Sequence, residues 1–182
     1  MTTALLIIDI QNDYFPGGAM ELAGSTEAGE RAGKLLEAFR GKSLPVIHVQ
    51  HISTRPGASF FVAGTRGVEI HPCVAPRDNE MLVRKNFPNS FRDTTLLQHL
   101  RDNRITRLVI AGMMTQMCID TTVRAAADLG FDCTLAHDAC ATRDLSFGGV
   151  TVPAASVQAA FLAALNGLFA KVRPIADICA EL

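Results

Sequence analysis

Short, nearly continuous apolar runs recur along the chain and alternate with segments in which apolar residues return every three or four positions. A short continuous run is typical of a strand covered on both faces, whereas the second spacing is typical of an amphipathic helix. The runs predict strands at Ala4–Ile8, Pro45–Val49, Glu80–Arg84, Arg107–Ala111, Phe131–Leu135 and, more weakly, Ala170–Val172. The spaced segments predict helices at Thr26–Phe39, Asp93–Leu100, Gln116–Leu129 and Ala154–Phe169.

The order of these segments predicts one α/β domain over residues 1–182. Alternation of strands with helices is typical of a mostly parallel sheet with helices on both faces. The stretch from His51 to Asn79 breaks this rhythm, because it is rich in proline and glycine. A loop of that length in a compact domain usually serves function or an interface. Open sheets of this class bind ligands beyond the carboxyl ends of their strands, so the residues that follow each apolar run are the candidates for function.

Composition and charge narrow the class of protein. The 182 residues are 48% hydrophobic and 19% charged, which is typical of a globular chain rather than a disordered one. A formal net charge of −1 gives no basic excess for nucleic acid, which is therefore not an expected partner. No apolar run approaches the roughly 20 residues of a membrane span, and no signal peptide is recognisable, so we expect no membrane association. Five cysteines without a C-x-x-C pair argue against a disulfide framework, and the cytoplasm is the expected location.

Three chemically active side chains lie where apolar runs end. Asp9 follows the first run, Lys85 ends the third, and Cys118 comes shortly after Gly112 at the end of the fourth. Thr115 is a plausible helix N-cap, which would place Cys118 in a first helical turn where a thiol has a depressed pKa. Singly, each has an ordinary alternative, namely a turn aspartate, a solvated lysine and a core cysteine. Together they offer a base, a cation and a nucleophile at one edge of the sheet.

These residues lie in three motifs through which the sequence, from Leu5 to about Val172, resembles the isochorismatase-like hydrolases, also called the cysteine hydrolase superfamily. The first motif is Leu6–Phe15, similar to the family's Asp-x-Gln-x-Asp-Phe opening with one extra residue before the phenylalanine. The second is Val83-Arg84-Lys85, followed by Ser90-Phe91 and Thr94-Thr95-Leu96. The third is Gly112-x-x-Thr115-x-x-Cys118.

The resemblance implies a fold and a chemistry. The fold would be a three-layer α/β/α, Rossmann-like arrangement with a six-stranded sheet in the order 3-2-1-4-5-6. Asp9 would be the general base, Lys85 its cationic neighbour and Cys118 the nucleophile of an Asp-Lys-Cys triad. A non-proline cis peptide would join Met113 to Met114, and the N–H groups of Met114 and Cys118 would form an oxyanion hole. The reaction implied is hydrolysis of an amide or carbamoyl C–N bond in a small molecule, through a thioester.

The same resemblance also leads to expectations about metal binding, the substrate pocket and the binding partners. Nicotinamidases of this superfamily hold a divalent ion with an Asp-x-His-type cluster after strand 2, where this sequence has His51 and Ser53. Without that carboxylate we expect no metal and no other cofactor, although His48, His51 and His71 are potential zinc ligands. The expected partners are a small amide-like substrate, water and further copies of the chain in a dimer or tetramer. The residues expected to line the substrate pocket are Phe15, Phe61 and Gln116.

Two other functions are compatible with the same residues. One is a metal-dependent nicotinamidase. The other is a non-catalytic α/β module that binds a small molecule, since a fold does not fix a function. A phosphate-binding loop at Gly24–Lys34 is excluded because no strand leads into it and Leu35 stands where Ser or Thr would follow Lys34.

Overall fold

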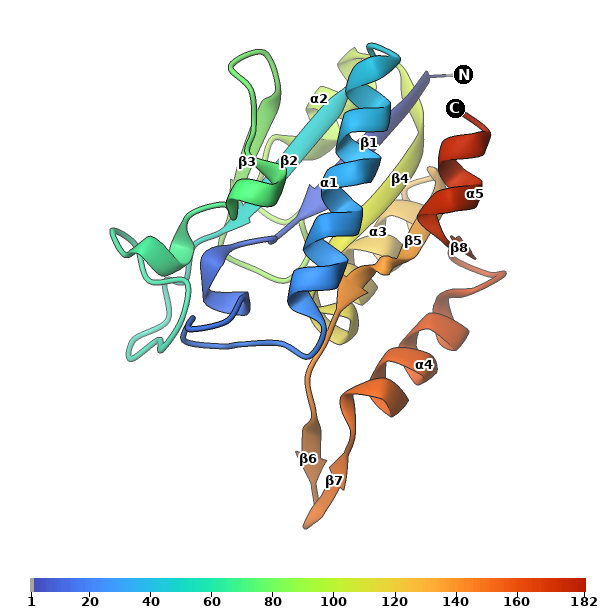
Figure 1. Cartoon of the computed structure of the whole chain (residues 1–182). Helices are drawn as coiled ribbons and strands as arrows, with labels where there is room; N and C mark the ends of the chain where they lie inside the picture. Colours follow the sequence, from blue (N-terminus) through green and yellow to red (C-terminus); the bar gives the residue numbers. More distant parts are fainter. Residues whose placement is uncertain (1) are drawn as a thin grey trace.

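A computed structural model describes residues 2–182 and shows a six-stranded parallel sheet between two layers of helices (Figure 1). The strands are β1 (Thr2–Ile8), β2 (Val46–His51), β3 (Met81–Lys85), β4 (Ile105–Met113), β5 (Asp132–Ala141) and β8 (Lys171–Arg173). Their order across the sheet is β3-β2-β1-β4-β5-β8. The predicted order 3-2-1-4-5-6 is confirmed, because β8 is the sixth strand of this sheet along the chain.

Successive residues of the central strand β1 pack into opposite layers, as the pleat of a strand requires. Leu5 and Ile7 belong to one hydrophobic cluster, and Leu6 and Ile8 belong to the other. Because both faces of β1 are covered, its sequence is a continuous apolar run rather than an alternating one. The first cluster joins helices α1 (Ser25–Gly41) and α5 (Ile175–Ala180) to the sheet, and the second joins α2 (Leu96–Asp102), α3 (Asp120–Asp128) and α4 (Ala154–Leu165).

The structure differs from the predicted elements at several places, and β5 runs on to Ala141 rather than ending at Leu135. The predicted helix Gln116–Leu129 is divided into a π-helical turn, η4 (Thr115–Ile119), and helix α3. Helix α4 ends at Leu165, where the chain turns through Gly167 with φ +91°. A hairpin of β6 (Leu145–Phe147) and β7 (Val150–Val152), and the short helix α5, have no counterpart in the prediction because each is too short to show a hydrophobic period.

The long segment after β2 is fastened to the sheet by the residues that follow β1. The Gln11 amide donates from Nε2 to the carbonyl oxygens of His51 (2.9 Å) and Val68 (2.7 Å), and it accepts from His51 N (2.8 Å). The Asp13 carboxylate accepts from Phe61 N at 2.6 Å. The segment between His51 and Asn79 is therefore a fixed wall beside the carboxyl ends of β1 and β2. It also contains the 3-10 turns η2 (Arg66–Val68) and η3 (Pro72–Val74), and η1 (Asn12–Tyr14) lies beneath it.

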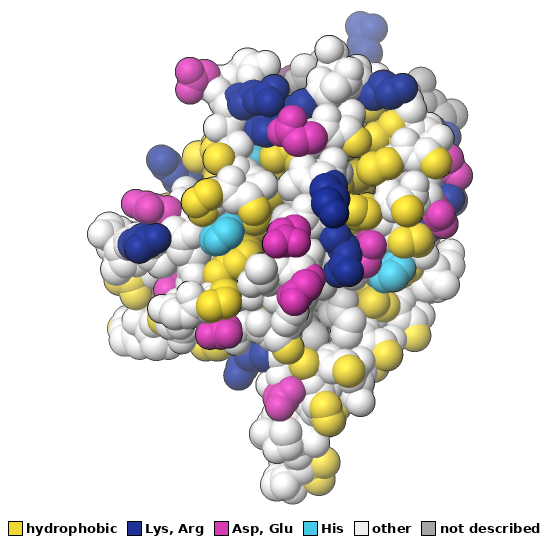
Figure 2. All heavy atoms as spheres, in the orientation of Figure 1, with side chains coloured by type: hydrophobic (Ala, Val, Ile, Leu, Met, Phe, Trp, Pro, Cys, Tyr) yellow, Lys and Arg dark blue, Asp and Glu magenta, His cyan; other side chains and the backbone are white. Residues whose placement is uncertain are grey.

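The β6–β7 hairpin and helix α4 extend away from the three-layer body (Figure 1). Helix α4 carries no charged side chain, and three apolar side chains on or near this extension are largely exposed: Phe147 (91%), Leu168 (81%) and Val150 (64%). Figure 2 shows hydrophobic side chains spread along the same extension. Within residues 2–182, every helix is too short or too polar to cross a membrane.

Candidate active site

Asp9, Lys85 and Cys118 meet at the carboxyl edge of the sheet, although they are far apart in the sequence. Asp9 directly follows β1, Lys85 is the last residue of β3, and Cys118 lies in the η4 turn after β4. β1 and β4 are neighbours, with Ile8 paired to Gly112. Gly112 has φ +143°, and a Cβ there would lie 2.0 Å from Ile8 O, so glycine is required where the two strands approach.

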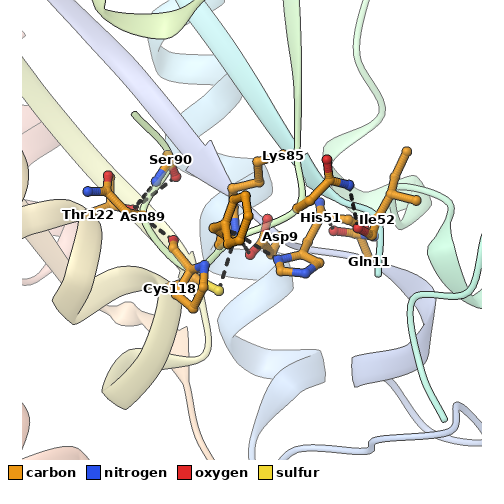
Figure 3. A network of polar contacts seen from close by, with 12 residues as sticks. Asp9, Gln11, His51, Ile52, Lys85, Asn89, Ser90, Cys118 and Thr122 are labelled. Carbon is orange, nitrogen blue, oxygen red and sulfur yellow. Dashed lines mark hydrogen bonds and ion pairs between the residues drawn. The ribbon is translucent and has the colours of Figure 1, made fainter. Parts of the chain in front are cut away.

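The ammonium of Lys85 forms the centre of the site (Figure 3). Its Nζ lies 2.7 Å from Asp9 Oδ2, 3.0 Å from His51 Nδ1, 3.1 Å from Phe87 O and 3.3 Å from Cys118 Sγ. The Lys85 and Asp9 side chains are fully buried. Burying such charges is costly unless they are paired, so the carboxylate and the ammonium hold each other in the ionised state. The predicted base, cation and nucleophile therefore form one contiguous cluster.

Burial and charge set the protonation states of this cluster. Burial alone lowers the pKa of Lys85, but the charges of Asp9 and Cys118 and hydrogen bonds to both raise it above its usual value. For Cys118, burial raises the pKa of the thiol well above its usual value, the Asp9 charge raises it further, and Lys85 acts in the opposite direction. The depressed thiol pKa expected from a helix N-terminus is therefore wrong. Burial and the charge of Asp9 outweigh any effect of the short π-helical turn, so Cys118 rests as a thiol.

The backbone around Cys118 has the form that the resemblance implies. The Met113–Met114 peptide bond is cis. Met114 and Cys118 both line the cavity above the cluster. The N–H of Met114 donates no hydrogen bond to another residue of the described chain, and the first N–H groups of a helical turn lack acceptors within the turn. The assignment of an oxyanion hole to Met114 and Cys118 stays a prediction.

A cavity of about 410 Å³ opens above Cys118. Its wall comes from the segment after β2, from η1, and from the chain after β3 and β5. The lining residues are Tyr14, Met20, His51, Ser53, Arg55, Pro56, Gly57, Ala58, Ser59, Phe60, Phe61, Asn86, Pro88, Met114, Met117, Cys118 and Arg143. Of the three predicted pocket residues, Phe61 is in this wall.

The other two predicted pocket residues lie elsewhere. Phe15 stacks on His71 with ring centroids 3.6 Å apart, and its ring abuts Gly29 of α1. The extra residue before Phe15 in the first motif means that Tyr14 takes the place in the cavity wall instead. Gln116 is buried, and its side-chain oxygen accepts from Thr142 Oγ1. Its Nε2 donates to Met114 Sδ at 3.5 Å, so the amide joins η4 to the chain after β5, and Gln116 does not line the cavity.

The histidines do not converge on a metal site. His48 is bound to Glu80 at 2.9 Å within the sheet, and His71 contacts Cys73 at 3.0 Å beside α1. His51 alone reaches the cluster, where its ligand atom, one from Asp9 and Cys118 Sγ all lie within 4.8 Å of one another. Those three could hold a cation by their chemistry, but the Lys85 ammonium already lies between them. The residues present therefore fit an internal lysine rather than a metal ion.

Several cavity residues were not predicted, and for reasons of geometry. Arg55 and Arg143 come from irregular segments whose approach to one cavity has no signal in the sequence. His51 is a potential metal ligand by its sequence, but in the structure it accepts a hydrogen bond from Lys85. Burial, followed by the charge of Lys85, lowers the pKa of His51 to about 4, so its ring is neutral near pH 7. Lys85 is the residue paired with His51 across β2 and β3, so the register of these strands would have indicated this contact.

Comparisons with known proteins agree with this geometry. The isochorismatase domain family model matches residues 3–177. The uncharacterized isochorismatase family protein YddQ of Bacillus subtilis is 50% identical over 95% of this chain and 96% of its own. A crystal structure of an isochorismatase-type hydrolase from Oleispira antarctica superposes with a TM-score of 0.95, at 52% identity, over 98% of this chain and 96% of that one.

A relative with a stated activity is more distant. Streptothricin hydrolase of Streptomyces noursei is 36% identical over 84% of this chain and 55% of its own. The family model and the two more similar proteins span nearly the whole chain and match the fold described above. The chain therefore belongs to the isochorismatase family of hydrolases, enzymes that act on C–N and related bonds.

Proposed function

We propose that this protein hydrolyses an amide or carbamoyl C–N bond of a small molecule, with Cys118 as nucleophile and Asp9 as general base. The observation that carries the proposal is the position of the Lys85 ammonium, 2.7 Å from Asp9 and 3.3 Å from Cys118 at the base of a cavity. One cation bound to both an acid and a sulfur is arranged to hold negative charge on either of them. This is what proton transfer between the two groups requires.

In the first half of the proposed reaction Asp9 removes the thiol proton and the thiolate attacks the carbonyl carbon. Negative charge develops on the carbonyl oxygen, where the N–H groups of Met114 and Cys118 are the proposed donors. One such donor typically contributes about 3–4 kcal/mol to the transition state. The C–N bond then breaks, and the departing nitrogen takes the proton from Asp9. The acyl group remains on Cys118 as a thioester.

In the second half a water molecule attacks the thioester carbonyl and Asp9 accepts a proton from it. The C–S bond breaks, the acid is released, and the proton returns from Asp9 to the Cys118 sulfur. Lys85 stays charged throughout, because its pKa lies above its usual value and three of its neighbours accept hydrogen bonds. Its role is to lower the energy of the thiolate when Asp9 becomes neutral.

The test is a pair of cysteine variants assayed for ammonia release from nicotinamide, carbamoyl amines and small cyclic amides. Cys118→Ala and Cys118→Ser should abolish hydrolysis of any substrate that the wild type accepts, while the melting temperature stays near that of the wild type. Cys133→Ala is the matched control, since Cys133 is equally buried but lies in β5 outside the cavity. Hydrolysis by Cys118→Ala at the wild-type rate would exclude the covalent route.

A metal-dependent nicotinamidase is the alternative, and the donor set argues against it. Lys85 lies among the atoms that would bind the ion, and His48 and His71 are engaged elsewhere. We also propose that the chain acts in the cytoplasm as a homo-oligomer. The five free cysteines suit a reducing compartment. The uncharged extension formed by α4 and the β6–β7 hairpin is the surface that a second copy would cover.

A further inference from the structure

The charged side chains that line the cavity above Cys118 are all positive. Two arginines, Arg55 and Arg143, line it. No aspartate or glutamate of residues 2–182 lines it, and Asp9 beneath the cavity is already paired with Lys85. A charged pocket with no counter-charge of its own attracts ligands of the opposite sign.

The two arginines have no protein partner to neutralise them. Within the described chain, neither forms an ion pair or a side-chain hydrogen bond, whereas Arg40, Arg124 and Arg173 each bind a carboxylate at 3.0 Å or less. Arg55 belongs to the wall after β2, and Arg143 lies between β5 and β6. Both side chains are exposed at the cavity, so their guanidinium groups are free to bind a ligand.

The charges of both arginines reach the inner part of the cavity. Burial and Lys85 lower the pKa of His51, and Arg55 lowers it further. Burial raises the pKa of Tyr14, and among the surrounding charges that of Arg143 acts to lower it. Because His51 and Tyr14 line the same cavity, the field of the two arginines extends over the space that a substrate would occupy.

His51, a polar side chain of the cavity wall, is also a hydrogen-bond donor. Lys85 can only donate, so His51 Nδ1 must accept from it at 3.0 Å. A neutral ring that accepts at Nδ1 carries its proton on Nε2. His51 therefore offers the cavity an N–H, and the polar lining formed by His51, Arg55 and Arg143 is suited to a substrate rich in acceptors.

We propose that the substrates of this cavity are amide or carbamoyl compounds that carry a carboxylate, and that Arg143 and Arg55 are the residues that select for it. This inference rests on the proposed function, because it takes Cys118 as the group beside the scissile bond. A guanidinium matches the planar, two-oxygen geometry of a carboxylate, so a ligand so held would have its orientation fixed as well as its charge balanced.

The test uses two alkylating reagents that share a two-carbon frame, iodoacetate with a carboxylate and iodoacetamide with a neutral amide. Both consume the same thiolate, so the ratio of their rates at Cys118 cancels the thiol pKa and reports the selectivity of the cavity. The site of labelling is assigned by peptide mass spectrometry, and glutathione at the same pH gives the ratio for a free thiol. The ratio of iodoacetate to iodoacetamide rates should exceed that of glutathione by about tenfold.

Substitution identifies the source of the preference. Arg143→Gln and Arg55→Gln should each reduce the ratio by about two- to fivefold, as loss of one ion pair at an exposed site would. Arg66→Gln is the matched control, because Arg66 lies on the same long segment but lines a different cavity. Its ratio should equal that of the wild type. Once a substrate is known, Arg143→Gln should raise KM for an N-carbamoyl amino acid by about two- to fivefold relative to KM for its methyl ester.

The outcomes separate this inference from the proposed function. Labelling of Cys118 with a ratio equal to that of glutathione, unchanged by either arginine variant, would overturn the carboxylate selection and leave the proposed function standing. Failure of both reagents to label Cys118 even in Asp9→Asn, which lacks a charge that raises the thiol pKa, would show that the cavity does not reach the thiol. Both proposals would then be wrong.

Discussion

Asp9→Asn should make alkylation of Cys118 faster and hydrolysis of the substrate slower. The substitution keeps the shape of the side chain and removes the negative charge that lies within 4.8 Å of the sulfur. At that distance, and with an effective dielectric constant of about 20, the carboxylate raises the energy of the thiolate by about 3 kcal/mol. This equals roughly two pKa units, so the pKa of the thiol should fall by about that amount.

The sign of the effect follows from the charges that remain. Burial and Asp9 raise the pKa of the Cys118 thiol, and Lys85 lowers it. In Asp9→Asn the thiolate becomes the counter-ion of the Lys85 ammonium, 3.3 Å away. Near pH 7 the thiolate fraction should rise about 100-fold, while the lower basicity of the sulfur reduces its intrinsic reactivity by nearly tenfold. Alkylation by iodoacetamide should therefore become about tenfold faster.

Hydrolysis should change the other way, because the variant has no group to accept the thiol proton and return it to the leaving nitrogen. Loss of a general base typically lowers kcat by about 10²–10⁴-fold. The assay is the iodoacetamide rate at Cys118 between pH 6 and 10, measured beside ammonia release. Asp120→Asn is the control, since Asp120 is close to Cys118 in sequence but its carboxylate pairs with Arg124. Unchanged alkylation, or hydrolysis at the wild-type rate, would refute the assigned role of Asp9.

Three further predictions concern the frame around the site. Gly112→Ala should prevent soluble expression or lower the free energy of unfolding by about 3 kcal/mol or more, because the new Cβ would lie 2.0 Å from Ile8 O. A melting temperature equal to that of the wild type would show that β1 and β4 are less tightly packed at this point. Burial alone raises the pKa of Glu80, but Arg40 and other donors lower it to about 2. The contribution of the Glu80 carboxylate to the stability of the fold is therefore present above about pH 4.5 and is lost as the pH falls toward 2. Denaturant titrations should show this acid loss in the wild type and a smaller one in Glu80→Gln, which should be about 1–3 kcal/mol less stable at pH 7. Phe147→Ser should shift sedimentation toward the monomer without changing the far-UV spectrum, and an unaltered mass distribution would place any subunit interface elsewhere.

The apolar runs predict the strands and place Asp9, Lys85 and Cys118 at strand ends, because both depend on the same signal. A strand covered on both faces needs a continuous apolar run, and such a run ends where the chain leaves the sheet. Asp9, Lys85 and Cys118 each follow a run of this kind, and the parallel order of β3, β1 and β4 then brings them to one edge. Which strands are neighbours is not contained in the apolar runs, and the prediction that the three residues meet comes from the strand order that the family resemblance implies.

The rest of the site depends on side-chain directions, which patterns do not contain. Gln116 was expected in the pocket, yet its amide is directed to Thr142, since a buried amide without a partner would be costly. The protonation of Cys118 also could not be predicted, because the sequence indicates a helical turn but not the degree of desolvation at the sulfur. Arg55 and Arg143 reach one cavity through irregular segments whose conformation depends on distant contacts.

The hydrogen bonds of Gln11 and Asp13 to the wall after β2 affect how this enzyme can change. They tie His51, Val68 and Phe61 to the end of the central strand, so this wall is built as a permanent part of the scaffold rather than as a closing flap. Evolution or a protein engineer can exchange the tip of that wall around Arg55 to accommodate a new molecule, while Asp9, Lys85 and Cys118 below keep their positions.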